Sequence, residues 1–268
     1  MIHGPPILRL ESVTKRFGGM TAIDDLSFDV TRGSRTALIG PNGAGKTTVF
    51  NIVTGAIPID AGSVFVDGQD ISRVASRRRI AHGVARSFQN VRLMPHLTTL
   101  ENVMVGQHCR NAGLFGVLQP VNLWPHNRWR EAARAALTDV GLERYAGATV
   151  KNLPYGVQKR VEVVRAMMAK PHLLLLDEPA AGLNSTETEA LQRLLERICD
   201  NGAVTLLVVE HDMHFVGALC DEVIVLDFGR KIAEGTPAEI RANARVQEIY
   251  LGTPVTDATE PRHAARSA

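Results

Sequence analysis

A glycine-rich segment between a predicted strand and a predicted helix constrains this chain more than any other feature. It matches the pattern G-x-x-x-x-G-K-[ST] and contains Gly40, Pro41, Asn42, Gly43, Ala44, Gly45, Lys46, Thr47 and then Thr48. Glycines let backbone N–H groups close around phosphate oxygens, and the N-terminus of the following helix, predicted over 45–54, adds partial positive charge. We therefore expect a phosphate-binding loop, in which Lys46 reaches the β- and γ-phosphates of a nucleotide and the Thr47 hydroxyl binds Mg²⁺.

A second signal is an apolar run that ends in two carboxylates. Residues 173–176 are all leucine, and Asp177 and Glu178 follow them. A carboxylate at the end of a buried strand is costly unless it serves a cation or a partner. We expect Asp177 to hold Mg²⁺, usually through water, and Glu178 to act as general base on a water that faces the γ-phosphate. Together with the upstream loop, this run predicts a P-loop nucleoside triphosphatase.

The composition argues against several other classes of protein. The chain has 268 residues with 30 basic and 28 acidic side chains, so its net charge of +2 gives no reason to expect a nucleic-acid partner. The cluster Arg77, Arg78 and Arg79 is local, and we expect it to be a solvated helix end. The three cysteines stand in no metal-ligand spacing and fit a reducing compartment. Since no signal peptide or membrane-spanning segment is predicted, we expect any membrane role to come through a partner protein.

The hydrophobic pattern predicts strands in the first third of the chain and helices in the middle. The predicted strands cover 7–13, 26–30, 35–39 and 63–66, with turns at Gly18-Gly19 and Asp67-Gly68. No strand is predicted from about residue 91 to 150, where helices are expected over 98–107 and 127–140 around a connection at 111–125. We interpret residues 91–165 as a helical insertion.

The last third alternates between strand and helix. It contains three buried strands, expected over 173–176, 204–209 and 222–226. Thr186 with Glu189 predicts a capping box at the start of a helix. One apolar face of that helix carries Leu191, Leu194, Leu195 and Ile198. The polar tail over 253–268 has no periodicity, and we expect it to be disordered.

Smaller motifs, taken in their order along the chain with the first two, indicate which kind of P-loop nucleoside triphosphatase this chain is. The informative stretches are KRFGGMTAIDDLSFDV, LIGPNGAGKTTVFN, RSFQNVRLM, LPYGVQKR, LLLLDEPAAGLN, VVEHDM and EIYLG. With them, the chain resembles an ABC transporter ATPase subunit over residues 7–252. Within that family it is most similar to the longer ATPase subunit of the branched-chain amino-acid importer. The resemblance implies an α/β fold: a P-loop NTPase (RecA-like) core with an antiparallel β subdomain and a helical ABC-specific subdomain.

The resemblance also implies roles for individual residues. Phe17 matches the aromatic residue that stacks on adenine, and Gln89 matches the glutamine that contacts Mg²⁺ or water and senses the membrane partner. Asn184 ends the loop that crosses to the opposite subunit. His211 matches the switch histidine that reaches the γ-phosphate. His214 stands three residues on, but a metal site is not expected because no third ligand accompanies the pair.

One segment departs from the family pattern. Most ABC ATPases carry Leu-Ser-Gly-Gly-Gln where this chain has Leu153-Pro154-Tyr155-Gly156-Val157. The serine hydroxyl that would contact the γ-phosphate bound to the partner is therefore absent, although proline is tolerated where a helix begins. Gly156 and the N–H groups after it can still present a helix N-terminus to phosphate. Tyr155 and Gly156 remain predicted nucleotide contacts, because the amino-acid importer branch also has Tyr-Gly here.

The resemblance implies a subunit that binds and hydrolyses ATP with Mg²⁺ and powers an importer for branched-chain or related amino acids. Two ATPase subunits would sandwich two ATP molecules, each site combining the 40–48 loop of one subunit with the Gly156 segment of the other. The implied partners are membrane permease subunits, a second ATPase subunit and, indirectly, a solute-binding protein. The implied location is the cytoplasmic face of the inner membrane, in peripheral association.

Alternatives stay open at this stage. Soluble ABC ATPases that act on DNA or ribosomes usually show long coiled coils or two fused ATPase units, and the sequence has neither. Pro154 leaves room for a regulatory subunit that hydrolyses ATP only weakly. An ATPase of a transporter for urea, amides or lipopolysaccharide would also fit the motifs. The chain does not reveal the solute, nor whether the second ATPase subunit is a copy of itself.

Overall fold

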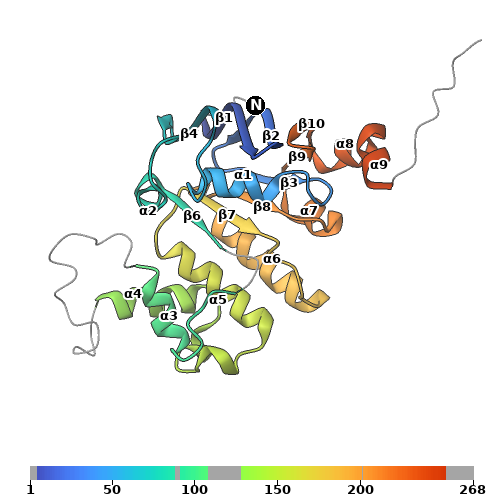
Figure 1. Ribbon diagram of the computed structural model, residues 1–268. Helices are drawn as coiled ribbons and strands as arrows, with labels where there is room; N and C mark the ends of the chain where they lie inside the picture. Colours follow the sequence, from blue (N-terminus) through green and yellow to red (C-terminus); the bar gives the residue numbers. More distant parts are fainter. Residues whose placement is uncertain (1–4, 88–90, 108–127, 201, 252–268) are drawn as a thin grey trace, which may run out of the picture.

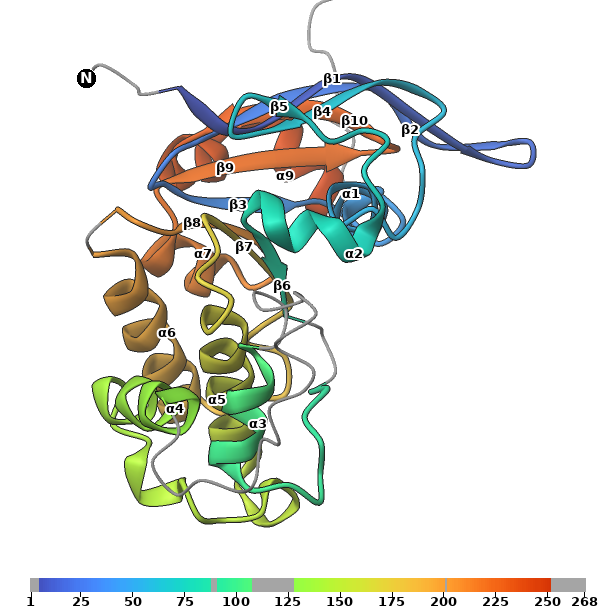
Figure 2. The ribbon, with the colours of Figure 1, turned by 90° about the vertical axis from the view of Figure 1, so that its left-hand side faces the viewer.

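The structure is a computed structural model that describes residues 5–87, 91–107, 128–200 and 202–251 (Figure 1). Three sequence predictions lie outside these residues: the role of Gln89, the connection at 111–125 and the disordered tail at 253–268. Within the described part, two sheets stack on one another, and several of the helices pack below them (Figure 2).

An antiparallel sheet has the strand order β2-β1-β4-β5. Its strands are β1 (Pro6–Phe17), β2 (Met20–Thr31), β4 (Ala61–Val66) and β5 (Gln69–Asp70). The turns at Gly18-Gly19 and Asp67-Gly68 are confirmed, and both residues of the second turn have positive φ, as a type I′ hairpin requires. β1 and β2 extend well past their predicted ends. Register shifts along this pair disturb the alternation on which the prediction relied.

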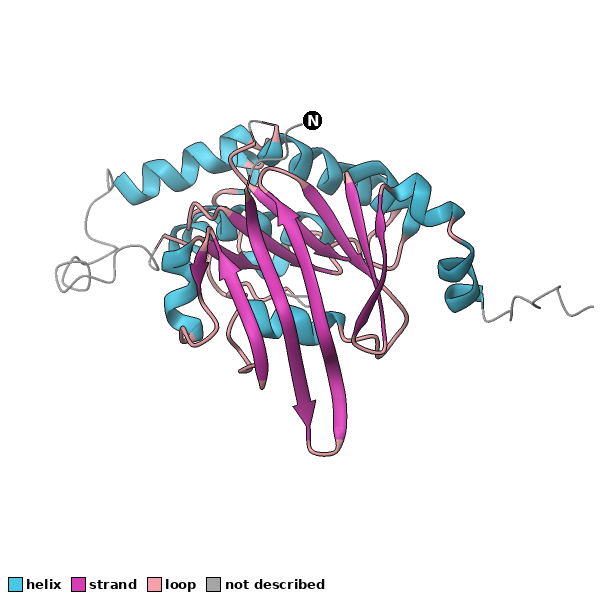
Figure 3. Ribbon diagram, turned by 90° about the horizontal axis from the view of Figure 1, so that it is seen from above, coloured by secondary structure: helices cyan, strands magenta, loops and turns pink. Residues whose placement is uncertain are grey.

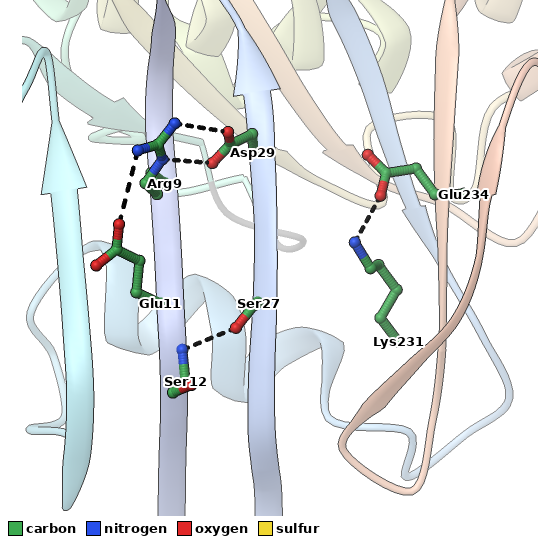
Figure 4. Close-up of polar contacts among 7 residues, drawn as sticks. All are labelled: Arg9, Glu11, Ser12, Ser27, Asp29, Lys231 and Glu234. Carbon is green, nitrogen blue, oxygen red and sulfur yellow. Dashed lines mark hydrogen bonds and ion pairs between the residues drawn. The ribbon is translucent and has the colours of Figure 1, made fainter.

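The face of this sheet that points away from the rest of the molecule is polar. Figure 4 shows side chains there from β1, β2 and the neighbouring β10: Arg9, Glu11, Ser12, Ser27, Asp29, Lys231 and Glu234. Arg9 Nε donates to Asp29 Oδ1 over 2.9 Å, and Lys231 Nζ donates to Glu234 Oε2 over 2.6 Å. Exposed pairs of this kind contribute little to stability. They do allow the sheet to present its outer face to water.

A second sheet has the order β10-β9-β3-β8-β7-β6 and is parallel except for β10. Its strands are β3 (Arg35–Ile39), β6 (Val84–Arg86), β7 (Leu173–Asp177), β8 (Thr205–Val209), β9 (Glu222–Asp227) and β10 (Arg230–Gly235). The apolar runs predicted as buried strands are confirmed as β7, β8 and β9. Sequence reasoning missed the two edge strands, because β6 is very short and β10 is polar and has no fully buried residue.

Helices cover the parallel sheet and form a separate layer beyond it (Figure 3). They are α1 (Lys46–Val53), α2 (Ser76–Arg79), α3 (Thr99–Val105), α4 (Arg128–Asp139), α5 (Tyr155–Met167), α6 (Ser185–Cys199), α7 (Met213–Leu219), α8 (Pro237–Ala242) and α9 (Ala244–Leu251). Single 3₁₀ turns occupy Ile80–His82, Glu143–Tyr145 and Val150–Asn152. No helix among the described residues is both long and apolar enough to cross a bilayer.

The capping box predicted from Thr186 and Glu189 is wrong. Helix α6 begins two residues earlier, with Asn184 as N-cap and Glu187 as the reciprocal partner. Asn184 Oδ1 accepts the Glu187 N–H over 2.9 Å, and a Glu187 carboxylate oxygen accepts the Asn184 N–H over 3.2 Å. Both pairs of residues satisfy the capping-box pattern, so the pattern alone does not choose between them. The pair Asn184 and Glu187 forms the cap because the helix begins directly after Asn184.

The expectation for the arginine cluster is wrong at Arg79. Arg77 and Arg78 are exposed, but Arg79 is only 3% exposed. Its guanidinium donates to the carbonyls of Ile52 and Val53 over 2.5 and 2.8 Å. These carbonyls belong to the last turn of α1, whose orphan acceptors a buried arginine can satisfy. Burial lowers the pKa of Arg79.

Three hydrophobic clusters organise the described residues. One lies between the antiparallel sheet and the near face of the parallel sheet, and it includes Phe50 of α1. The second lies on the opposite face of the parallel sheet, under α6 and α7. The third joins α3, α4 and α5 and includes Trp129 and Val157. The helices predicted over 98–107 and 127–140 are confirmed within the described residues, apart from their ends.

Candidate nucleotide site

The carboxyl ends of the parallel strands bring the predicted motifs to one edge of the sheet. Leu38 of β3 pairs with Val209 of β8, which pairs with Asp177 of β7. The loops that leave these strands therefore start side by side, and they carry the glycine-rich segment, Glu178 and His211. Ligand sites of parallel sheets lie at this edge, because loops from separate strands converge there.

Two glycines of the loop between β3 and α1 are required by close backbone approaches. Gly40 has φ +151°, and a Cβ there would lie 2.2 Å from the carbonyl oxygen of Leu226 in β9. Gly45 has φ +102°, and a Cβ there would lie 2.7 Å from Ile23 Cδ1 and 2.8 Å from the Ala22 carbonyl oxygen. The predicted Gly-rich pattern thus fits the packing of this loop against β2 and β9.

Lys46 lies across its own loop. Its ammonium donates to the carbonyl oxygens of Gly40 and Pro41 over 2.6 and 2.9 Å. Burial lowers the pKa of Lys46, while the nearby carboxylates of Glu178 and then Asp177 oppose that shift. A lysine charge held at the mouth of the loop and close to two carboxylates can reach phosphate oxygens with a small rearrangement.

The N-terminus of α1 has no anion of its own. Gly45 is the N-cap, no side chain makes a capping hydrogen bond, and the first turn holds no acidic residue. Helices α3, α6 and α8 differ, because each is closed by a capping box with a glutamate. The first N–H groups of α1, next to Thr47 and Thr48, are therefore arranged to accept an external anion such as phosphate.

Asp177 ends β7 in a buried ion pair. Arg86 Nη2 donates to Asp177 Oδ2 over 2.6 Å, and the two side chains are 10% and 9% exposed. Sequence reasoning did not single out Arg86, because nothing in the local sequence links residues 86 and 177. Their neighbourhood follows only from the pairing of β6 with β7.

Glu178 follows directly in a strained backbone conformation. Its φ is +44°, an unusual value for a residue with a Cβ, and its N–H donates to the Val209 carbonyl over 2.9 Å. Such strain costs on the order of 1–3 kcal/mol and concentrates at functional sites. The role of Glu178 as general base, which the sequence predicted from its position, stays a prediction.

Sequence reasoning gave no role to Glu210, which is 1% exposed at the end of β8. Its carboxylate accepts the N–H groups of Ala180 and His211 over 2.9 and 3.2 Å. Burial raises the pKa of Glu210, and these hydrogen bonds oppose the shift. The side chain ties the loop after Glu178 to the loop of His211. The signal that marked Asp177, an apolar run ending in a carboxylate, was also present here.

His211 itself is largely exposed, with a side chain 67% exposed and Nδ1 3.8 Å from Glu210 Oε2. It lies between β8 and α7, at the same edge as Glu178. Phe17 is 45% exposed at the end of β1, with Lys15 Nζ 5.3 Å from its ring centroid. The Phe17 ring is therefore not part of the core, and its predicted stacking on adenine stays a prediction.

The segment 153–157, which departs from the family pattern, leads into α5, and the N–H of its glycine already has a partner. Pro154 is the N-cap, and the Gly156 N–H donates to Glu187 Oε1 over 3.2 Å. A Cβ at Gly156 would come within 2.7 Å of the Glu187 side chain, so a larger residue there would push that side chain aside. Tyr155 is 40% exposed, whereas Val157 is buried in the helical cluster. The Val157 side chain therefore serves packing.

The fold and this edge of the sheet define the class: a P-loop nucleotide-binding ATPase with an added antiparallel sheet and a helical layer. Comparisons with known proteins agree. The family described as "ABC transporter" matches residues 23–181, and the family described as "Branched-chain amino acid ATP-binding cassette transporter" matches residues 230–256. BraF of Pseudomonas aeruginosa, a high-affinity branched-chain amino acid transport ATP-binding protein, is 40% identical over 252 residues, which is 92% of this chain and 98% of BraF.

Solved structures show the same likeness. The ADP conformation of MJ1267, an ATP-binding cassette of an ABC transporter, aligns with a TM-score of 0.83 and 29% identity over 93% of this chain and all of that one. The ATP-binding cassette MJ0796, a dimer bound to ADP and Pi, aligns with a TM-score of 0.70 and 26% identity over 86% of this chain and 98% of that one. The chain belongs to the ABC transporter family, in which it is an ATP-binding ATPase subunit.

Proposed function

We propose that this protein is the ATPase subunit that powers an importer of branched-chain or related amino acids. The observation that carries the proposal is the match of residues 230–256 to the branched-chain amino acid transporter family, on a chain similar to BraF over nearly its full length. The ABC transporter match accounts for ATP hydrolysis, and the carboxyl-terminal match accounts for the choice of solute.

The site residues divide into those for the nucleotide and those for a metal ion. The loop N–H groups and Lys46 bind the phosphates, and Phe17 stacks on the adenine. Thr47 and Asp177 offer a hydroxyl and a carboxylate, which are the oxygen ligands that Mg²⁺ prefers, and Gln89 would add an amide oxygen. Mg²⁺, when bound, neutralises negative charge on the phosphate oxygens.

In this proposal, the protein accelerates hydrolysis mostly by positioning the attacking water and the γ-phosphate. Glu178 aligns a water and takes its proton, while His211 donates to the γ-phosphate. Glu210 holds the two loops that carry these side chains together, because its carboxylate accepts a backbone N–H group from each loop. Glu210 is thus a positioning residue, which holds the loops and does not touch ATP.

One chain supplies half of each site, so we propose a dimer of ATPase subunits. The Gly156 segment and the Asn184 loop would face the nucleotide bound by the other subunit. The permease subunits would contact the Gln89 region and the helical layer. A cavity of about 340 Å³ between β6 and the helical layer, with Val105 and Arg165 in its lining, supports contact at the helical layer. Such a subunit would lie at the cytoplasmic face of the membrane, while a solute-binding protein delivers the amino acid.

The test is transport in proteoliposomes that contain this protein, its permeases, its second ATPase subunit and the solute-binding protein. We expect ATP-dependent uptake of leucine, isoleucine and valine. Glu178→Gln should lower ATP turnover at least about 100-fold while ATP still binds, because a general base contributes roughly 10²–10⁴-fold. Unchanged turnover would remove Glu178 from that role. Uptake of urea or amides instead would leave the ATPase assignment intact and contradict the solute.

A further inference from the structure

One buried side chain joins the two elements that carry the proposed metal ligands. Arg86 of β6 donates from Nη2 to Asp177 Oδ2 over 2.6 Å and from Nη1 to Asn51 Oδ1 over 2.7 Å. Asp177 ends β7, and Asn51 lies on α1. A guanidinium is planar and holds its donors in a rigid fork, so it fixes two acceptors relative to one another.

The contact on α1 is placed where it can orient Thr47. Asn51 follows Thr47 by four residues, so the two side chains share one face of the helix. The Arg86 guanidinium also lies 5.4 Å from the centroid of the Phe50 ring, a second contact with α1. The bridge that Arg86 forms between Asp177 and Asn51 therefore sets the position of the Thr47 face of α1 relative to the Asp177 carboxylate.

Stability alone does not account for this ion pair. Both side chains are about nine-tenths buried, and removing two charges from water costs about as much as their attraction returns. An apolar pair of similar volume would hold β6 to β7 at least as well. What an apolar pair could not do is hold the carboxylate in one orientation.

We propose that Arg86 is a positioning residue for the metal site. It holds Oδ2 of Asp177, which leaves Oδ1 to face the hydration shell of a divalent cation, and through Asn51 it keeps Thr47 at the matching distance. This inference rests on the proposed function, which assigns Thr47 and Asp177 to Mg²⁺. Partners that orient a metal ligand in this way commonly change metal affinity by 10–100-fold.

The experiment measures Mn²⁺ binding to the full-length protein with ADP, by electron paramagnetic resonance, and ADP binding without metal, by calorimetry. We expect Arg86→Gln to weaken Mn²⁺ binding about tenfold or more and to change metal-free ADP affinity less than about twofold. Arg86→Lys should recover part of the Mn²⁺ affinity, since an ammonium keeps the charge beside Asp177 but lacks the rigid planar fork that fixes Asp177 and Asn51 relative to one another.

A control is the more exposed Arg35–Asp221 ion pair near the amino-terminal ends of β3 and β9, whose Nη2 and Oδ1 are 2.6 Å apart. Arg35→Gln should leave Mn²⁺ and ADP affinities unchanged. If Arg86→Gln does not fold, as judged by thermal melting, Asn51→Ala takes its place, because it breaks only one arm of the bridge. It should weaken Mn²⁺ binding several-fold.

Unchanged or tighter Mn²⁺ binding in a folded Arg86→Gln protein would overturn the inference. So would an equal loss of metal-free ADP affinity, which would indicate a purely structural role. Asp177→Asn distinguishes this failure from failure of the proposed metal site. If Asp177→Asn weakens Mn²⁺ binding and Arg86→Gln does not, only the role of Arg86 is wrong. If neither weakens it, the assignment of Asp177 to the metal is wrong as well.

Discussion

Two helix N-termini in this molecule are proposed to face phosphate, and they differ in what occupies them. The N-terminus of α1 has a glycine N-cap, no capping side chain and no acidic residue in its first turn. At the N-terminus of α5, the Gly156 N–H is already bonded to the Glu187 carboxylate of the same chain. The Glu187 carboxylate occupies the position that an external anion would take, because helix N-termini attract negative charge.

This difference means that the N-terminus of α1 is arranged to bind phosphate within one chain, whereas the N-terminus of α5 would bind phosphate only when a second chain brings it. The loop before α1 is fixed by contacts with β2 and β9, so its backbone is set to bind phosphate once the Lys46 ammonium turns away from the loop carbonyls. The end of α5 is closed by Glu187, and a nucleotide from the partner would have to displace that carboxylate. Self-capping would thus keep the second half-site satisfied until a phosphate arrives.

The largest expected effect comes from breaking the α1 end. Gly45→Ala places a Cβ 2.7 Å from Ile23 Cδ1 at φ +102°, so both a clash and backbone strain oppose the loop. We expect ATP affinity to fall about 100-fold or more, since each such distortion costs on the order of 1–3 kcal/mol. Equilibrium binding of a fluorescent ATP analogue measures this.

Gly43→Ala serves as the control for that substitution. Gly43 has φ +85°, but a Cβ there would meet no atom within 4 Å, so strain remains without the clash. The loss of affinity should be clearly smaller than for Gly45→Ala. Equal losses would mean that packing against β2 does not set the loop.

A smaller effect is expected from opening the α5 end. Glu187→Ala frees the Gly156 N–H and removes a negative charge that would repel the γ-phosphate from the partner. We expect ATP-dependent dimerisation to tighten roughly three- to tenfold, measured by sedimentation in a Glu178→Gln background that blocks hydrolysis. The same substitution should lower stability by about 1 kcal/mol, because α6 loses its capping box.

Glu239→Ala is the matched control, since it removes the equivalent capping box of α8. It should leave dimerisation unchanged. Weaker dimerisation in Glu187→Ala would contradict the comparison and would mean that Glu187 supports the α5 end in its working geometry.

The smallest effect concerns pH. The N–H and hydroxyl of Thr98 lower the pKa of Glu101 in the capping box of α3. A lowered folded-state pKa adds stability above the ordinary glutamate pKa, and that stability is lost as the pH falls through the lowered value. Glu101→Gln should therefore cost about 0.5 kcal/mol at pH 7 and less at pH 3, in urea unfolding. As a control, Glu189→Gln changes an exposed glutamate that pairs with Arg193 outside any capping box, and its cost at pH 7 should be smaller. Helix α1 has no carboxylate in its first turn and no such dependence is expected of it.

Local patterns in the sequence were enough to predict much of the fold. Each apolar run ending at the carboxyl edge became a buried strand, because a strand covered on both faces must be apolar throughout. The same reasoning missed β6 and β10, which are short or polar edge strands. It also placed the start of α6 at the wrong residue, since two overlapping patterns both qualified as capping boxes.

The sequence by itself determined the phosphate loop, the acidic pair at the end of β7 and the order of the family motifs. These are local, and their chemistry depends on residue types at fixed spacing. Only the tertiary structure decided which side chains support them. Arg86 meets Asp177 across 91 positions of sequence, and Glu187 meets Gly156 across 31. Such contacts depend on how strands and helices pack, because distance along the chain does not limit which buried charges become neighbours.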